Sequence, residues 1–211
     1  MAANKDIIRV LLDRYGRSYA TEAGIKLADK PAPLYQLLVL ATLLSARISG
    51  EIAIAAVREL FGAGYRTPTA MREATWQDRV DALGRGHYKR YDERTATMLG
   101  DGAGLLQQRW HGDLRELHEE GGDDAGRLAD LLTEFPGIGP AGASIFLREV
   151  QGIWTGVAPY LDQKVLDGAR QLSLPKTKLA ELADGNIVEL ASALVRVTLN
   201  KRAADEIIAA T

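Results

Sequence analysis

The sequence predicts an all-α protein of about ten helices. Apolar residues recur at helical spacing through nearly the whole chain of 211 residues. An uncharged apolar run over residues 34–46 is typical of a helix that is buried on all sides. An alternating pattern of the kind that marks a strand is present only weakly, over residues 156–161.

Composition narrows the class of protein. A hydrophobic content of 46% in 211 residues suits one compact unit or two small lobes. The apolar run 34–46 is shorter than the roughly 20 residues that span a bilayer, and the first ten residues lack a signal-peptide layout. We therefore expect a cytoplasmic protein without a membrane partner. The absence of cysteine excludes disulfides, a thiol nucleophile and a Cys-ligated iron–sulfur cluster.

Start and stop signals define the first helices. The predicted N-caps are the polar residues that precede helical patterns, Asp6, Ser49, Thr67 and Thr75. Pro68 after Thr67 strengthens that start, because proline suits the first position of a helix. Glycines end two of these helices, at Gly62 and Gly84.

The second half of the chain reads as six further helices. They are expected over residues 92–110, 125–134, 140–150, 162–172, 178–183 and 186–210. The most loop-like stretch is the acidic segment 118–127. His111 and His118 stand near its acidic residues, so a metal cluster is conceivable there. A solvated polar loop is the favoured interpretation, and no metal site is predicted.

The turn between the helices 125–134 and 140–150 is short and rich in glycine. Gly137 and Gly139 are free to take positive φ and to let another backbone come close. The helix that begins at Pro140 presents unpaired N–H groups and the positive end of its dipole, which is a site for an anion such as a DNA phosphate. The predicted DNA contacts of this hairpin are Gly137, Ile138, Gly139, Ala141 and Gly142. The alternative is an ordinary tight turn between helices.

The charge of the chain does not by itself indicate a nucleic-acid binder. The formal net charge is −2, so DNA binding requires a local patch. Residues 84–94 supply one, in which Arg85, Lys89, Arg90 and Arg94 are interleaved with aromatic residues. Such a segment holds phosphates and stacks against bases. A loop with solvated charges is the alternative.

Four segments carry a family resemblance. In chain order they are PLYQLLVLATLLSARIS, YDERTATML, FPGIGPAGASIFL and QGIWTGVAPYLDQKVLDGAR. Together they resemble the HhH-GPD superfamily of DNA glycosylases, whose type member is endonuclease III, over residues 30–200. The resemblance implies a two-lobed helix-hairpin-helix fold. Residues 31–148 would form the lobe with the hairpin, and residues 1–30 plus 149–211 the lobe with a catalytic aspartate.

The resemblance also implies site residues. Asp162 stands where the family has its catalytic aspartate, and a carboxylate there stabilises the charge that develops on deoxyribose. The position fits an N-cap of the next helix equally well. Arg47, Lys89 and Arg90 are expected to contact DNA. The residues expected to line a pocket for the flipped base, although each also fits a core position, are Tyr35, Trp154 and Tyr160.

Departures from the family pattern refine the expected activity. Ala141 stands where bifunctional members have a lysine, and a Schiff base needs an amine, so AP lyase activity should be weak or absent. The loop that carries the iron–sulfur cluster in endonuclease III is missing. The family resemblance also implies a monovalent cation bound to the carbonyls of the hairpin. The implied function is a monofunctional DNA glycosylase of base excision repair, acting as a monomer on double-stranded DNA with a damaged or mispaired base. The alternative is a non-catalytic helix-hairpin-helix protein that binds DNA structures.

Overall fold

The computed structural model describes residues 2–200 and 202–211, and within these ranges the chain is all-α, as predicted. Helices α1 to α14 and two short 3₁₀ helices are present, and the described residues contain no strand. The chain divides into two compact units. Unit 1 comprises residues 1–19 and 148–211, and unit 2 comprises residues 20–147.

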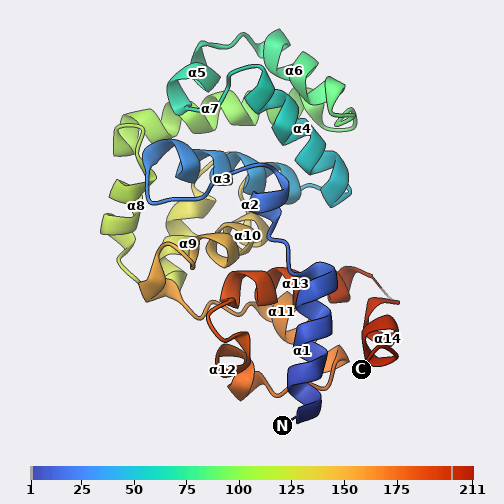
Figure 1. Cartoon of the computed structure of the whole chain (residues 1–211). Helices are drawn as coiled ribbons and strands as arrows, with labels where there is room; N and C mark the ends of the chain where they lie inside the picture. Colours follow the sequence, from blue (N-terminus) through green and yellow to red (C-terminus); the bar gives the residue numbers. More distant parts are fainter. Residues whose placement is uncertain (1, 201) are drawn as a thin grey trace. The chain divides into compact units, whose positions relative to one another are not determined.

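Unit 2 is a helical bundle around α3 (Figure 1). Its helices are α2 (Tyr19–Glu22, across the boundary), α3 (Pro31–Leu44), α4 (Gly50–Gly62), α5 (Pro68–Glu73), α6 (Trp76–Arg85), α7 (Asp92–Trp110), α8 (Leu114–Gly121), α9 (Ala125–Thr133) and most of α10 (Pro140–Val150). Helix α3 is buried almost all round and packs against α4 and α8. Helix α7 packs against α5, α6 and α8. The apolar run 34–46 therefore lies at the centre of this unit.

Unit 1 is built around α13. Its elements are α1 (Ala2–Tyr15), the end of α10, η1 (Thr155–Val157), α11 (Gln163–Gln171), η2 (Lys176–Lys178), α12 (Leu179–Ala183), α13 (Ile187–Leu199) and α14 (Ala203–Ile208). Helix α13 packs against α1, α11, α12 and α14. Leu190 and Leu194 of α13 are fully buried in a core shared with Leu11 of α1 and Val165 of α11.

The limits of the units differ from the sequence prediction at residues 20–30. These residues were expected with the N-terminal helix, and the structure groups them with unit 2. Ala23 and Ile25 are buried, and the Arg58 guanidinium of α4 donates a hydrogen bond to the carbonyl of Glu22. Helix α10 contributes residues to both units, with Arg148 as its first residue in unit 1.

Three of the four predicted N-caps are present. The hydroxyls of Ser49, Thr67 and Thr75 accept hydrogen bonds from the N–H of Ile52, Ala70 and Asp78, at 3.3, 3.2 and 3.1 Å. Asp6 is wrong as a cap, because α1 begins at Ala2. Gly84 is wrong as a helix end, because α6 continues to Arg85 and Gly86 caps it.

Other differences arise where tertiary burial outweighs local polarity. The segment expected as an acidic loop, 118–127, contains the second half of α8, a helix that buries Leu114, Leu117 and Gly121. The weak strand pattern at residues 156–161 forms no strand, and its first two residues belong to the 3₁₀ helix η1. The single helix expected over residues 186–210 is two helices, α13 and α14; residue 201 lies outside the described residues.

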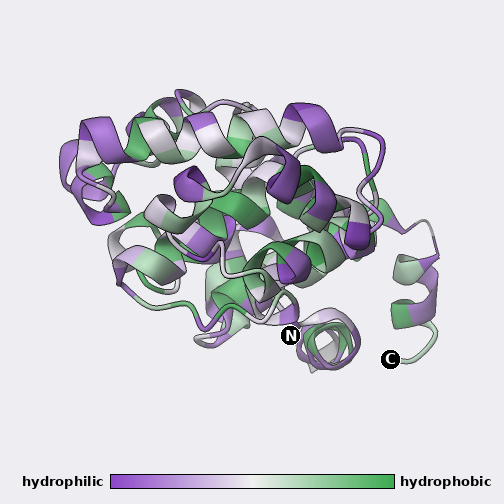
Figure 2. Ribbon diagram, turned by 90° about the horizontal axis from the view of Figure 1, so that it is seen from above, coloured by the Kyte–Doolittle hydropathy of each residue, from purple (hydrophilic) through white to green (hydrophobic). Residues whose placement is uncertain are grey.

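Hydropathy follows the packing of the helices. Figure 2 shows hydrophobic residues gathered on the sides of helices that face other helices, with hydrophilic residues on the outer sides. Within the described residues, no helix combines the length and the apolar character that crossing a membrane requires.

A substitution at Gly86 would test the close packing of the end of α6 against α4. A Cβ atom there would lie 2.3 Å from Cα and 2.5 Å from N of Ala56 in α4, so Gly86→Ala should destabilise the protein by about 1–3 kcal/mol. Gly104 in α7 is the matched control, because its Cβ would meet no atom within 4 Å. Gly104→Ala should stabilise by about 0.5–1 kcal/mol. Urea unfolding followed by circular dichroism measures both, and equal stabilities would contradict the close contact between α6 and α4.

Candidate functional site

The hairpin turn between α9 and α10 spans residues 134–139. The N–H of Ile138 donates to the carbonyl of Phe135 at 3.0 Å, and Gly137 has the predicted positive φ, +88°. A Cβ at Gly137 would lie 2.8 Å from Sδ of Met98 and 3.2 Å from Cγ2 of Thr42. Both the backbone conformation and the packing therefore require glycine at this position.

Gly139 differs from the expectation. Its φ is not positive, and a Cβ there would meet no protein atom within 4 Å. A larger residue at this position would therefore not clash with the turn itself. The space beside Gly139 is open, directly before the first turn of α10.

The start of α10 has an exposed and a buried side. Pro140 and Ala141 are exposed, whereas Ile138 is only 4% exposed and Gly142 is buried against its side chain. Ile138 is thus a core anchor of the turn. A molecule that approaches the hairpin from outside would meet the backbone from Gly139 to Ala141.

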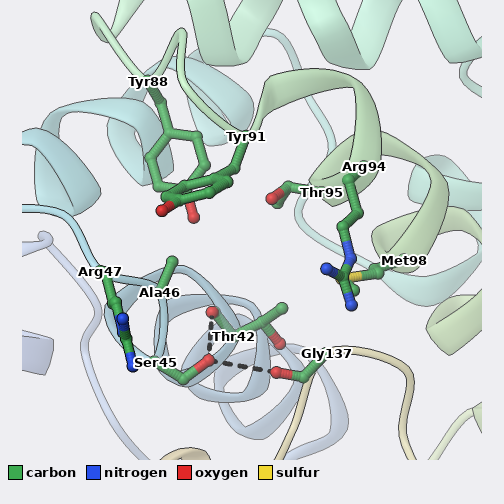
Figure 3. Close-up of a pocket in the computed structure, with 10 residues that line it drawn as sticks. All are labelled: Thr42, Ser45, Ala46, Arg47, Tyr88, Tyr91, Arg94, Thr95, Met98 and Gly137. Atoms are coloured by element: carbon green, nitrogen blue, oxygen red, sulfur yellow. Dashed lines mark hydrogen bonds between the residues drawn. The ribbon is translucent and has the colours of Figure 1, made fainter.

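The serine that caps the C-terminal end of α3 contacts the hairpin turn. The Oγ atom of Ser45 lies 2.7 Å from the carbonyl oxygen of Thr42 and 3.1 Å from that of Gly137 (Figure 3). The hydroxyl is placed to donate to either carbonyl, and the second contact joins the end of α3 to the hairpin. The sequence singled out this Leu-Leu-Ser-Ala segment only through the family resemblance, without a role for the hydroxyl.

A pocket of about 300 Å³ adjoins the turn within unit 2 (Figure 3). Its lining residues are Thr42, Ser45, Ala46, Arg47, Tyr88, Tyr91, Arg94, Thr95, Met98 and Gly137. Of the predicted DNA contacts, the structure therefore brings Arg47 and Gly137 together at one site. Lys89 and Arg90 are exposed on the loop between α6 and α7 and are not part of this lining.

The loop between α6 and α7 contributes Tyr88 and Tyr91 to the lining of this pocket. Tyr88 is fully buried; its hydroxyl lies 3.5 Å from the carbonyl of Leu43, and burial raises its pKa. Tyr91 is half-buried, with the Arg90 guanidinium 5.2 Å from its ring centroid. His87, between these elements, is exposed with φ +63°, an uncommon conformation for a residue with a side chain.

Asp162 is the N-cap of α11 in unit 1. Its Oδ1 accepts a hydrogen bond from the N–H of Val165 at 3.1 Å, so the cap interpretation is confirmed. Its Oδ2 accepts from Nη1 of Arg148 at 2.9 Å. The two side chains are only 12% and 6% exposed, so this is a buried ion pair. Sequence reasoning missed Arg148, although an arginine among apolar residues late in a helix is a signal for a buried partner.

Gln151 holds the segment before Asp162. Its side-chain amide donates to the carbonyls of Arg148 and Tyr160, at 2.9 and 3.3 Å, and its Oε1 accepts from the N–H of Tyr160 at 2.8 Å. The end of α10 is therefore tied to the backbone two residues before Asp162. Together with Arg148, these contacts fix the position of the carboxylate within unit 1.

The three aromatic residues expected in a base pocket lie in different units. Tyr35 belongs to unit 2 and is 2% exposed; its hydroxyl has no hydrogen-bond partner in the described part of the chain, and burial raises its pKa. It borders a void of about 10 Å³ with Phe135 and Pro136. Trp154 is buried and Tyr160 half-buried, both in unit 1. Their role in holding a base stays a prediction.

Histidines in and before the acidic segment pair with nearby carboxylates. His111 lies 2.8 Å from Glu116 and His118 lies 3.2 Å from Asp123, each as a pair of side-chain atoms. Glu120 accepts from the Trp110 indole at 2.8 Å, and this hydrogen bond lowers the pKa of the carboxyl. No grouping of three metal-ligating His, Cys, Asp or Glu side chains occurs among residues that the structure describes.

Comparison with known proteins gives a distant likeness to solved structures. No family model matches the chain, and no curated protein matches it. Among solved structures, the chain is similar to a trapped endonuclease III–DNA covalent intermediate, an estranged-adenine complex, with 18% identity and a TM-score of 0.49. The alignment covers 90% of this chain and 84% of that one. A likeness this distant does not assign the chain to a family.

The Arg148–Asp162 pair predicts a specific loss of stability. Arg148→Met should destabilise the protein by about 3–5 kcal/mol, because it leaves a buried carboxylate without its counter-charge. Arg170→Met is the matched control in the same unit, since Arg170 pairs with Asp167 at 3.2 Å but is 74% exposed. Its cost should be about 0–1 kcal/mol. Urea denaturation of the three proteins measures this, and equal midpoints would show that burial does not strengthen the first pair.

Proposed function

We propose that this chain is a monofunctional DNA glycosylase of base excision repair that binds double-stranded DNA through its hairpin. The observation that carries the proposal is the hairpin turn itself. Gly137 has positive φ, Ile138 is buried beneath the turn, and the space beside Gly139 is open. This leaves the first turn of α10 accessible to a phosphate, whose charge suits the N-terminus of a helix.

The contact would be made by backbone and not by lysine. The first N–H groups of a helix have no acceptor within the helix, and they carry a partial positive charge. A contact of this kind positions the protein on the phosphate backbone without reading the base sequence. It also explains how a chain with a net charge of −2 would hold DNA.

Asp162 would supply the chemistry. Cleavage of an N-glycosidic bond develops positive charge on the sugar, which a fixed carboxylate stabilises. Val165 N–H and Arg148 each engage one oxygen of Asp162. A carboxylate oxygen has a further lone pair, so either oxygen can orient a water molecule and accept its proton while the side chain stays in place.

A lyase step is not part of the proposal. Ala141 offers no amine for a Schiff base, so borohydride should not trap the protein on abasic DNA. Efficient trapping would point to another amine, and Lys164, exposed in the first turn of α11, would be the first to test.

A monovalent cation at the hairpin stays a prediction. The carbonyls of Phe135 and Gly137 each accept one hydrogen bond, and each oxygen keeps a second lone pair. Carbonyl oxygens are suitable ligands for a hard cation, so these two residues fit the role. A bound cation would add positive charge beside a phosphate, and no step above depends on it.

A second function is favoured by one observation. Both oxygens of Asp162 already have partners, and its ion pair with Arg148 is buried. That arrangement is also what a purely structural clamp between α10 and α11 requires. The corresponding function is a non-catalytic protein that binds DNA structures through the hairpin.

The hairpin contact predicts the effect of filling the space beside Gly139. Gly139→Val adds a side chain where no protein atom lies within 4 Å, so the fold should be retained while a phosphate is kept away. Duplex affinity should fall about tenfold or more, and equally on unrelated sequences. Fluorescence anisotropy at low and moderate salt measures this. Ala180→Val, at an exposed position of α12, is the control. Unchanged affinity in folded Gly139→Val would remove the hairpin from DNA binding.

Asp162 is tested by removing its charge. Oligonucleotides with uracil, oxidised, alkylated or mismatched bases, followed by hot alkali, identify the substrate. Asp162→Asn should then reduce single-turnover excision by about 10²–10⁴. This variant leaves Arg148 buried without a counter-charge, so Asp162→Asn combined with Arg148→Gln, which removes both charges, is measured beside it.

Melting temperatures establish that each Asp162 variant is folded at the assay temperature. A near wild-type excision rate in either folded variant would exclude Asp162 from the chemistry. Excision of no base by the wild-type chain, with duplex binding retained, would favour the non-catalytic function.

A further inference from the structure

The pocket beside the hairpin has a lining of unusual composition. Four segments of unit 2 form it: the end of α3, the loop after α6, the first turns of α7, and the hairpin turn. Its volume of about 300 Å³ is at the lower end of the range for small-molecule sites, which is about 300–1,000 Å³. None of the features that support DNA backbone binding at α10 accounts for it.

The charge of the lining is entirely positive. Arg47 and Arg94 are its charged residues, and both are exposed. Some other arginines of unit 2 lie close to carboxylates, as Arg85 does to Glu59 at 3.0 Å and Arg115 to Asp113 at 2.6 Å. In the described part of the chain, neither Arg47 nor Arg94 forms such a pair. The acids nearest in sequence, Glu51 for Arg47 and Asp92 and Glu93 for Arg94, are not in the lining.

The remaining lining provides a ring surface and hydroxyls. In Figure 3 the rings of Tyr88 and Tyr91 lie on one side, the guanidiniums of Arg47 and Arg94 flank the space, and Ser45 lies opposite the rings. Tyr91 is half-buried, so part of its ring remains accessible. Aromatic faces stack on nucleobases with little regard to their identity. Guanidinium groups match the geometry of a phosphate.

We propose that this pocket binds one nucleotide, with its phosphate on Arg47 and Arg94 and its base on Tyr91. An apolar ligand would bury two guanidiniums without a counter-charge, which is costly. A bare inorganic anion would leave the ring surface unused. The nucleotide has two possible sources, a free nucleoside monophosphate or a nucleotide displaced from a DNA strand. The strand source rests on the proposed function, whereas binding of the free nucleotide does not.

The first experiment titrates the full chain with deoxynucleoside monophosphates, the corresponding nucleosides and inorganic phosphate. Binding is followed by calorimetry and by NMR of the ¹⁵N-labelled protein. The monophosphate should bind at least tenfold more tightly than either the nucleoside or phosphate. Signals of residues around Tyr91 and Gly137 should shift. Equal binding of phosphate and nucleotide would show that only an anion is held, and no binding of any probe would also overturn the proposal.

Variants locate the site. Arg94→Gln and Tyr91→Leu should each weaken nucleotide binding about tenfold, the loss expected for one charged hydrogen bond or one stacked ring. Arg72→Gln, at an exposed position of α5 outside the lining, should leave it unchanged. Full affinity in both pocket variants would overturn the proposal.

The second experiment separates the two sources. A duplex with one bulged nucleotide should displace the monophosphate if the pocket takes a nucleotide from a strand. Failure to displace it identifies the free nucleotide as the ligand. Gly139→Val serves as the independent arm: it should weaken duplex binding and leave monophosphate binding intact. Monophosphate binding with unchanged duplex affinity in that variant would refute the hairpin proposal alone.

Discussion

The contact between the Gly137 turn and α3 is the constraint on which the site in unit 2 depends. Gly137 packs so closely against Thr42 and Met98 that no side chain fits, and the Ser45 hydroxyl contacts its carbonyl at 3.1 Å. The turn therefore cannot shift without disturbing the most buried helix of the unit. The accessible start of α10 and one wall of the pocket take their positions from this contact. A backbone site is useful only if the backbone is rigid, and the core supplies that rigidity.

In unit 1, the position of Asp162 is fixed by an ion pair and a backbone hydrogen bond. Asp162 is held by a backbone N–H of α11 and by a buried guanidinium from α10. A buried ion pair contributes less to net stability than its geometry implies, because desolvation of both charges is costly. Its value lies in fixing one orientation of the carboxylate. That property serves a catalytic group and a structural clamp equally, which is why activity measurements, rather than further geometry, separate the two functions.

The features that could be predicted from the sequence are those that depend on residues close together in the chain. Ser49, Thr67 and Thr75 cap their helices because capping is a contact over three residues. Helix α8 was not predicted, because most of its residues are polar and its buried face consists of few apolar residues, among them Leu114 and Leu117. The contacts of Arg148 with Asp162 and of Ser45 with Gly137 were not predicted, because the paired residues lie 14 and 92 positions apart in the sequence. Pairing over such distances leaves no periodic signal, so one sequence alone does not reveal it.

The distribution of charge links the proposed site to the acidity of the chain. With 28 acidic and 26 basic residues, long-range attraction to DNA is weak, and a site must work at short range. Helix N-terminal amides do so, since their partial charges act within the first turn. Arg47 and Arg94 would do so as well, because no acidic side chain lines their pocket. Association with DNA would then depend on fit at the hairpin and pocket more than on electrostatic steering, and its rate should respond only weakly to salt.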